Sequence, residues 1–213
     1  MKILCFSLGQ LQANCYFLIK NGECLIIDPA DEASFILEEL QRRQLKLIGM
    51  LATHGHFDHI IAAGEIQLSI KTPLFISSED RFLIDRLEET AEYFLGFTPN
   101  IIKPTPINLP TGEAGQLIGV KCKIANFEFE KIPSPGHTPG SCCYSFKKEG
   151  VIFTGDTLFK QGIGRYDFSY SNRNELKKSL EKLLKIPKDT IVYPGHGEET
   201  IIGNEKEFAL TLF

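Results

Sequence analysis

The order of strands and helices along the sequence predicts an α+β fold, a four-layer αββα sandwich. Short apolar runs with strand character alternate with amphipathic helical segments, and the two halves of the chain resemble each other in layout. Strands and helices in this order favour two mostly antiparallel sheets packed face to face with helices outside. No Pro-, Gly- or Ser-rich linker interrupts the chain, so we expect a single domain covering residues 1–213.

The first half of the chain is predicted to contain five strands and three helices. Short runs of aliphatic, β-branched and aromatic residues indicate strands, at 2–8, 14–20, 23–28, 47–52 and 73–76. Asn21-Gly22 between the second and third runs is typical of a two-residue hairpin turn. Apolar residues at helical spacing indicate helices, beginning at 33 and covering 58–69 and 77–94, the last with Ser77 as its cap and a break near Asp85.

The second half repeats this layout after an irregular segment. Residues 96–115 contain four prolines, which indicates a surface loop that crosses near the functional site. Further strands are predicted at 116–124, 127–133, 141–147, 150–155 and 190–193. A helix is predicted at 172–185, with Asn172 or Ser171 as its cap, and a short terminal helix at 201–210.

Composition excludes several classes of protein. Apolar residues make up 43% of the 213 residues and charged residues 23%, which is ordinary for a globular protein. The net charge of −4 argues against a nucleic-acid partner held by phosphate contacts. No apolar stretch reaches the roughly 18 residues that a membrane span needs. The first residues are predicted to form a strand, not a signal peptide. The six cysteines contain no CxxC pair, so we expect reduced, mostly buried thiols in a cytoplasmic protein.

The strongest functional signal is the segment Thr53–His59. Four metal-ligand side chains, His54, His56, Asp58 and His59, follow the apolar run at 47–52. The C-terminal end of a strand is where α/β sheets usually place ligand sites. In an extended segment His54 and His56 point the same way. Imidazole and carboxylate together suit zinc, iron and similar ions. A solvated His-rich loop is the alternative interpretation.

Three further candidates occur in glycine-rich turns after predicted strands. They are His137 in Pro135–Gly140, Asp156 after Gly155, and His196 between Gly195 and Gly197. Glycine allows the turn conformations that aim a neighbouring side chain at an ion. Taken singly, each is a satisfied loop residue or a turn residue. Together they repeat one arrangement of strand, glycine and ligand, and they account for all five histidines of the chain.

These motifs resemble the metallo-β-lactamase superfamily over residues 1 to about 205. The resemblance lies in HxHxDH at 54–59, the lone His137, Gly155-Asp156 and the late Gly195-His196. Further stretches are similar to the glyoxalase II branch, in particular to its short, single-domain bacterial members, which resemble hydroxyacylglutathione hydrolases. These stretches are Gly155–Phe159, Gly162–Arg165 and Pro194–Gly197. The family fold is an αββα sandwich, in agreement with the predicted layout.

The resemblance implies two metal ions. One would be held by His54, His56 and His137, the other by Asp58, His59 and His196, with Asp156 as the bridge. The chemistry agrees, because seven ligands are too many for one tetrahedral zinc, whereas two ions about 3.5–4 Å apart use them all. We expect zinc, with iron or manganese as alternatives. A metal-bridging hydroxide would attack a carbonyl, and we assign a catalytic role to Asp58 as well. Zinc β-lactamases lack the bridging Asp and are less similar.

The predicted substrate is a small-molecule thioester of glutathione type, such as S-lactoylglutathione. With all five histidines on metals, no imidazole remains as general acid, and a thiolate leaves without one. Tyr144 and Tyr166 are candidate proton donors, with packing as the alternative interpretation. Arg165 matches a basic position of the glyoxalase II loop and would bind a substrate carboxylate. Otherwise it is a surface arginine beside Asp167, which stands where the family loop has an aromatic residue.

Two other functions stay open. A mononuclear-iron persulfide dioxygenase of the same fold would use His54, His137 and Asp156 as a facial triad. A non-enzymatic metal-binding module is the third possibility.

In two-domain glyoxalase II a C-terminal helical region adds glutathione contacts, and we expect no such domain here because the chain ends at Phe213. The apolar terminal segment suits either a monomer or a homodimer.

Overall fold

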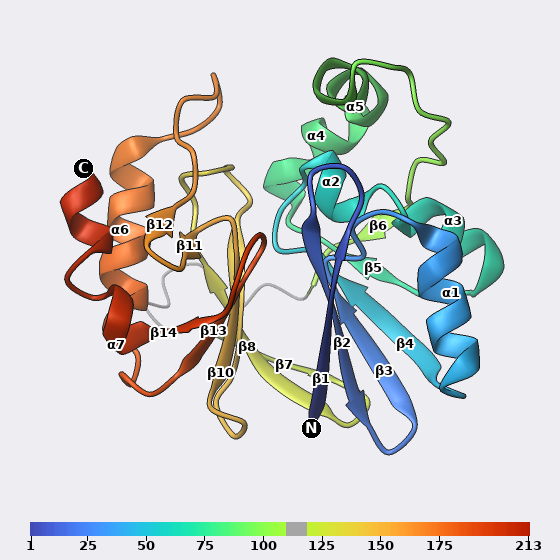
Figure 1. Cartoon of the computed structure of the whole chain (residues 1–213), viewed down its shortest axis with the longest axis horizontal. Coiled ribbons are helices and arrows are strands. Elements are labelled where there is room, and N and C mark those ends of the chain that lie inside the picture. The colour runs from blue at the N-terminus through green and yellow to red at the C-terminus, as the bar shows by residue number, and fades with distance from the viewer. Residues whose placement is uncertain (110–118) are drawn as a thin grey trace. The chain divides into compact units, whose positions relative to one another are not determined.

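The computed structural model describes residues 1–109 and 119–213. The chain divides into two compact units. Unit 1 comprises Met1–Leu109 and Ile124–Phe127, and unit 2 comprises Pro110–Lys123 and Glu128–Phe213. Each unit is built around a six-stranded sheet (Figure 1). The expectation of a single domain stays a prediction.

The sheet of unit 1 is mixed, with the strand order β1-β2-β3-β4-β5-β6. Its strands are β1 (Lys2–Leu8), β2 (Ala13–Lys20), β3 (Glu23–Ile27), β4 (Lys46–Leu51), β5 (Leu74–Phe75) and β6 (Pro106–Ile107). β1, β2 and β3 pair antiparallel, whereas β3 through β6 pair parallel. The prediction of a mostly antiparallel sheet is therefore wrong for this unit. Helical crossovers follow β3, β4 and β5, and a crossover returns the next strand in the same direction.

Helices fill the connections of unit 1. They are α1 (Ala33–Arg42), α2 (Phe57–Ile60), α3 (Ala63–Ser69), the 3₁₀ turn η1 (Ser78–Asp80), α4 (Arg81–Asp85) and α5 (Leu87–Leu95). The single helix predicted at 58–69 is divided into α2 and α3, because backbone groups near the junction form hydrogen bonds with Ala30. The N–H of Ala30 donates to the His59 carbonyl (2.8 Å), and the N–H of Ala62 donates to the Ala30 carbonyl (2.9 Å). Ser77 precedes η1 as predicted, but its side chain forms no capping hydrogen bond.

Two local predictions in unit 1 are confirmed. Asn21 and Gly22 both have positive φ, 53° and 77°, as a two-residue hairpin between β2 and β3 requires. The helical segment after Ser77 is interrupted between α4 and α5, next to Asp85. The predicted loop at 96–115 is irregular as far as Leu109 except for β6. Its remainder and the start of the strand predicted at 116–124 lie outside the described residues.

Unit 2 carries the sheet with the order β14-β13-β10-β9-β8-β7. Its strands are β7 (Val120–Ile124), β8 (Phe127–Pro133), β9 (Cys142–Phe146), β10 (Val151–Gly155), β13 (Ile191–Pro194) and β14 (Thr200–Ile201). β8, β9 and β10 pair antiparallel, and β10 pairs parallel with β13. A ribbon of β11 (Leu158–Phe159) and β12 (Gly162–Ile163) stands apart. The sequence prediction missed β11, β12 and β14, because two residues are too short to show periodicity.

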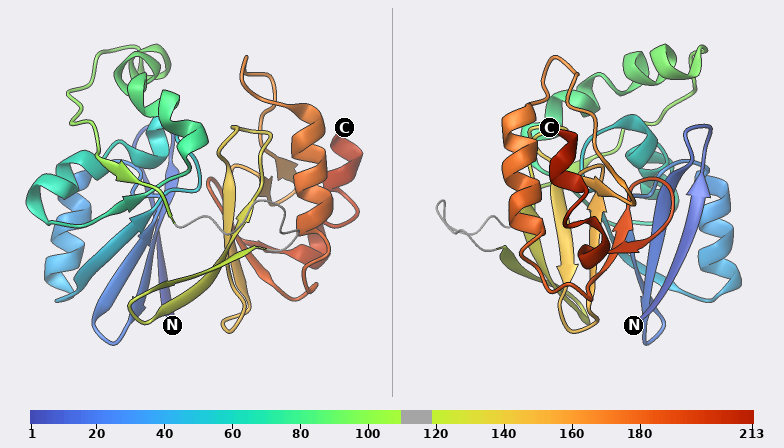
Figure 2. Two further views of the ribbon diagram at one scale, coloured as in Figure 1. Left: turned by 180° about the vertical axis from the view of Figure 1, so that it is seen from behind. Right: turned by 60° about the vertical axis from the view of Figure 1, so that its left-hand side comes forward.

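The helix α6 (Arg173–Leu183) covers the sheet of unit 2 (Figure 2). Its leucines Leu176, Leu180 and Leu183 join sheet residues such as Ile152 in one buried cluster. The predicted cap is confirmed, because the Asn172 side chain accepts hydrogen bonds from two N–H groups of the first turn (3.0 and 3.1 Å). The helix predicted at 201–210 is instead α7 (Ile202–Glu205) followed by the 3₁₀ turn η2 (Ala209–Leu212).

The six cysteines, all among the described residues, form no disulfide bond. Cys15, Cys24, Cys142 and Cys143 are buried, whereas Cys122 is half-buried and Cys5 is exposed. Among the described residues, no helix combines the length and the apolar character that crossing a bilayer requires.

Candidate metal centre

The loop after β4 carries the donors of unit 1. β4 is the fourth of six strands and ends at Leu51, and α2 begins six residues later. His54 and His56 in this loop and His59 in α2 are buried, whereas the side chain of Asp58, also in α2, keeps 14% of its surface exposed. Four candidate ligand side chains therefore follow the C-terminal end of a strand inside the sheet, where the sequence predicted them.

The four side chains of this loop converge. Nε2 of His54 lies 3.0 Å from Nδ1 of His56, which confirms that the two histidines point the same way. Nε2 of His59 lies 3.7 Å from Oδ2 of Asp58. His54 and His59 offer ligand nitrogens within 4.8 Å of each other, and their ring centroids are 4.2 Å apart. Imidazoles and a carboxylate at this spacing suit zinc, iron or manganese.

A buried aspartate at the end of β3 orients this loop. Asp28 is 1% exposed and accepts hydrogen bonds from the N–H and the hydroxyl of Thr53, both at 2.7 Å. Its Oδ2 also lies 3.0 Å from Nδ1 of His59. A partner on Nδ1 aims Nε2 at the ligand position and sets the tautomer. Asp28 therefore holds the loop backbone at Thr53 and the ring of His59 together.

A second buried aspartate, Asp80, was missed by the sequence analysis. It is fully buried at the end of η1, and its Oδ2 accepts a hydrogen bond from the N–H of Gly55 at 2.9 Å. Gly55 stands between the candidate ligands His54 and His56. A Cβ at Gly55 would come within 2.9 Å of Asp80 Cβ and 3.1 Å of Leu83 Cβ, so only glycine fits. The sequence showed this aspartate only as part of a helix start, without a signal for its partner.

In unit 2 three turns bring together His137, Asp156 and His196. His137 lies between β8 and β9, Asp156 follows β10, and His196 follows β13. β10 and β13 run parallel, so their C-terminal ends meet at one edge of the sheet, where Gly195 N–H donates to the Gly155 carbonyl (2.9 Å).

The Asp156 carboxylate lies between the two histidines. Its Oδ2 is 3.5 Å from Nε2 of His137 and 3.7 Å from Nε2 of His196. On the other side of the His137 ring, Nδ1 lies 2.8 Å from the backbone carbonyl oxygen of Arg165. A Cβ at Gly164 would sit 1.7 Å from the Asp156 carbonyl oxygen, so the chain passes this close to the cluster only with glycine there.

Arg165 is engaged by its neighbours. Its Nε and Nη2 donate to the two carboxylate oxygens of Asp167 at 2.9 and 2.8 Å, and its guanidinium lies 4.5 Å from the centre of the Phe168 ring. These hydrogen bonds lower the pKa of the Asp167 carboxyl. The two side chains are about 60% exposed, so solvent can compete for the pair. This agrees with the alternative interpretation of Arg165 as a surface arginine paired with Asp167. The binding of a substrate carboxylate by Arg165 stays a prediction.

The two candidate tyrosines are packed. Tyr144 is fully buried in β9 and makes an edge contact with the Phe129 ring at 5.7 Å. Tyr166 stacks on Phe213 with ring centroids 5.9 Å apart. The packing interpretation therefore applies to both rings.

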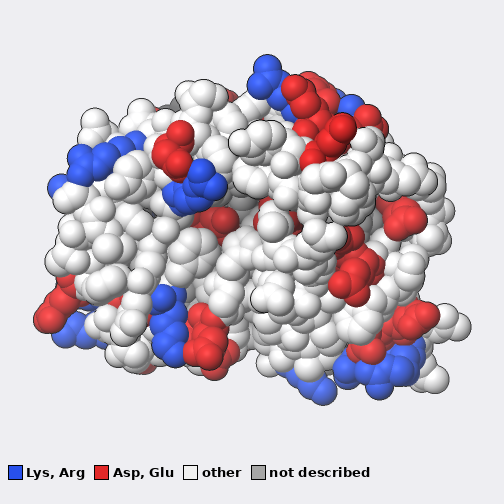
Figure 3. Space-filling view, turned by 45° about the horizontal axis from the view of Figure 1, so that its top comes forward, with Lys and Arg blue, Asp and Glu red and all other residues white. Residues whose placement is uncertain are grey.

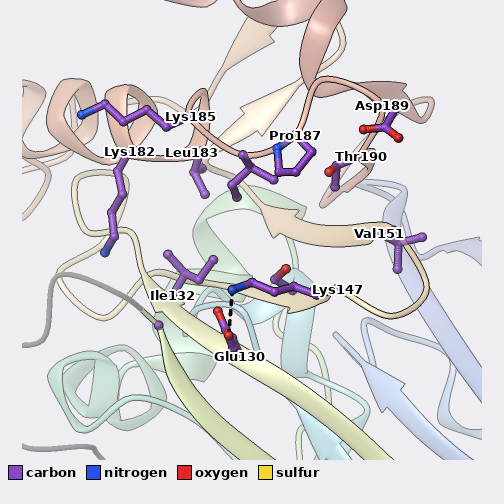
Figure 4. Close-up of a pocket in the computed structure, with 14 residues that line it drawn as sticks. Glu130, Ile132, Lys147, Val151, Lys182, Leu183, Lys185, Pro187, Asp189 and Thr190 are labelled. Atoms are coloured by element: carbon purple, nitrogen blue, oxygen red, sulfur yellow. Dashed lines mark ion pairs between the residues drawn. The ribbon is translucent and has the colours of Figure 1, made fainter.

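The largest of the cavities described in unit 2 lies elsewhere, with a volume of about 600 Å³ (Figure 4). Its wall includes Lys182 from α6 and Lys185 and Pro187 from the segment after α6, and Lys147 pairs with Glu130 (2.8 Å) along it. None of the predicted ligands lines this cavity. It is therefore separate from the candidate centre.

Comparison with known proteins finds relatives that match nearly the whole chain. The family model described as the metallo-beta-lactamase superfamily matches residues 8–196. The Haemophilus influenzae hydroxyacylglutathione hydrolase GloC is 36% identical over 209 residues, covering 97% of this chain and 95% of that protein.

Solved structures confirm the predicted fold class. The BLEG-1 B3 metallo-beta-lactamase is 34% identical with a TM-score of 0.88, covering 99% of both chains. TTHA1623 in a di-iron-bound form is 31% identical with a TM-score of 0.83, covering 97% of this chain and 98% of that one. The chain belongs to the metallo-β-lactamase superfamily, with the fold of that family and the function of a metal-dependent hydrolase that uses divalent metal ions.

Proposed function

We propose that the chain hydrolyses a thioester of glutathione type, with S-lactoylglutathione as the reference substrate, at a binuclear metal centre. His54, His56 and His137 would hold one ion. Asp58, His59 and His196 would hold the other, and Asp156 would bridge the two. Zinc is the first choice, but the His/Asp donor set accepts iron or manganese equally, and the related TTHA1623 binds two irons.

The position of Asp156 carries the proposal. Its Oδ2 lies between Nε2 of His137 and Nε2 of His196, at 3.5 and 3.7 Å. A carboxylate with an imidazole on each side suits a bridge between two ions, each of which takes one of the histidines. Zinc β-lactamases lack this aspartate, so it favours the glyoxalase II branch, to which the relative GloC also points.

The chain's own residues orient the donors. Asp28 holds Nδ1 of His59, and the Arg165 carbonyl oxygen lies against Nδ1 of His137. Such partners commonly change metal affinity or activity by about 10–100-fold. When bound, divalent ions supply Lewis-acid activation of water and of the scissile carbonyl. The side chain of Asp58 is 14% exposed, and we propose that its carboxylate accepts the proton of the attacking water.

The leaving group follows from the histidine count. The chain has five histidines, and all of them belong to the two clusters. Tyr144 and Tyr166 are packed. A leaving group that needs no general acid is therefore favoured, and a thiolate with an ordinary pKa near 8.5 meets this condition better than an amine.

The test is an activity panel with metal analysis. Protein purified from its native host is assayed with S-lactoylglutathione, a chromogenic β-lactam and a glutathione persulfide, and metals are counted by mass spectrometry. We expect two metals per chain, thioester turnover that a chelator abolishes, and no oxygen uptake.

Other outcomes would point to other functions. β-Lactam turnover alone would instead favour the activity of BLEG-1, and one iron per chain with oxygen uptake would favour the persulfide dioxygenase. We place the enzyme in the cytoplasm, as a monomer or homodimer without nucleic-acid or membrane partners.

A further inference from the structure

Large apolar side chains gather at the C-terminal end of α5 in unit 1. Tyr93 is 82% exposed, Phe97 50% and Phe94 40%, and Leu11 in the turn between β1 and β2 is 39% exposed. We call these four residues the apolar rim. Scattered exposed apolar residues are normal, but a group of them marks an interaction surface.

The apolar rim continues into the metal-ligand loop. Phe57, which separates His56 from Asp58 in the sequence, stacks on Phe94 with ring centroids 6.0 Å apart and planes at 23°. Tyr93 meets the Phe94 ring edge-on at 5.1 Å. α5 and α2 lie side by side at the upper end of unit 1 (Figure 1). The rim is therefore joined by ring contacts to a segment that carries two donors.

A small crevice places the rim beside Asp58 itself. Leu11, Phe57, Asp58 and Leu95 line a cavity of about 10 Å³, the size of a single water. Leu11 from the β1–β2 turn and Leu95, the last residue of α5, thus border the same space as Asp58.

The charge around the crevice favours a neutral group. Its lining includes two carboxylates, Asp31 and Asp58, and none of the residues described as lining it is basic. On α5 Glu88, Glu89 and Glu92 are exposed, and Arg86 lies before the first turn, at the end away from the rim. In Figure 3 the charged side chains form small groups, some of both signs and some acidic only, and much of the face between them is uncharged. An anionic group would meet carboxylates here, whereas an apolar group would bury apolar surface.

We propose that the apolar rim binds the acyl portion of the substrate, and that aromatic or medium-chain acyl thioesters are better substrates than short hydroxyacyl ones. This inference rests on the proposed function. Asp58, which we propose as the acceptor of the proton of the attacking water, lines the crevice beside the rim. The acyl portion is attached to the carbonyl that this water attacks, so it is the part of the substrate that would lie beside the rim. Complete burial of one CH₂ is worth about 0.8 kcal/mol, or roughly fourfold, so partial contact is expected to give about twofold per carbon.

The first experiment holds the thiol constant. kcat/KM is measured for the acetyl, butyryl and hexanoyl thioesters of glutathione with the metal-loaded protein. We expect the hexanoyl thioester to exceed the acetyl thioester by about sixteenfold, which is about twofold for each of four partly buried carbons. Tyr93→Ser and Phe97→Ser are expected to lower this ratio at least threefold. Leu68→Ser, at a 73% exposed leucine of α3, is the matched control and leaves the ratio unchanged.

A binding measurement separates the inference from the proposed function. Calorimetry with the thioethers S-methylglutathione and S-hexylglutathione requires no turnover, and we expect tighter binding of the hexyl compound that Phe97→Ser abolishes. If this preference holds while no thioester is hydrolysed, the inference stands and the proposed function fails. If thioesters are hydrolysed with no dependence on chain length, or if Leu68→Ser acts like Phe97→Ser, the inference is overturned and the function stands.

Discussion

Asp28 and His59 are 31 residues apart in the sequence, and their side chains meet with Oδ2 3.0 Å from Nδ1. Both are buried, at 1% and 0% exposure. The same carboxylate also accepts from the N–H and hydroxyl of Thr53. One aspartate at the end of β3 therefore determines the direction of an imidazole and the path of the loop that carries it.

Asp28→Asn is expected to weaken metal binding. In the variant, an amide NH₂ group replaces one carboxylate oxygen, so a donor of Thr53 or His59 faces another donor and loses its acceptor. Loss of such a partner lowers metal affinity by about 10–100-fold. Competition with a chromogenic chelator measures the change, with the exposed Asp85→Asn as the control. Wild-type affinity in the Asp28 variant would show that the orientation of His59 does not depend on this contact.

Asp80 is expected to act through the backbone of Gly55. Asp80→Ala leaves a buried N–H without its acceptor, which costs about 1–3 kcal/mol in the free energy of unfolding. Asp80→Asn keeps an acceptor oxygen and is expected to lose less. Urea denaturation of both variants, with metal content measured in parallel, tests this order. Equal losses in the two variants would argue against the hydrogen bond as the cause.

Asp58→Ala is expected to remove one of the two proposed ions and to leave the other partly bound. Under the proposed assignment, the ion held by Asp58, His59 and His196 is lost, whereas the ion on His54, His56 and His137 stays partly bound. Mass spectrometry is expected to count fewer than two metals per chain but more than none. Retention of both ions would refute the assignment of Asp58.

The buried thiols are expected to resist alkylation at neutral and mildly alkaline pH. Burial raises the pKa of Cys24 and of Cys143 from 9.0 to about 12, because it disfavours the thiolate. A raised folded-state pKa contributes stability that is complete below about pH 9 and is lost as the pH rises toward 12. Iodoacetamide labelling followed by peptide mass spectrometry should modify the exposed Cys5 first. Rapid labelling of Cys24 or Cys143 in the folded protein would contradict this.

Local patterns predicted much of each unit. Except for the two-residue strands β6 and β14, the strands of both sheets follow from apolar periodicity, as do α1 and the interrupted helix after Ser77. The Asn172 cap follows from capping chemistry within a few residues. The prediction of a single helix at 58–69 was wrong because backbone groups in its middle form hydrogen bonds with Ala30, which lies in a turn distant in the sequence. The mixed pairing of the unit 1 sheet was also missed, because strand direction depends on which strands become neighbours, and periodicity does not encode this.

By itself, the sequence determined which side chains are candidate ligands and on which turns they stand, because HxHxDH and the glycine-flanked His137, Asp156 and His196 are local patterns. Only the tertiary structure decided what orients them. The contacts of Asp28 with His59, Asp80 with Gly55 and the Arg165 carbonyl with His137 join residues 25 to 31 positions apart. Such pairs form when the strands and helices pack, and the spacing of residues along the chain carries no record of them.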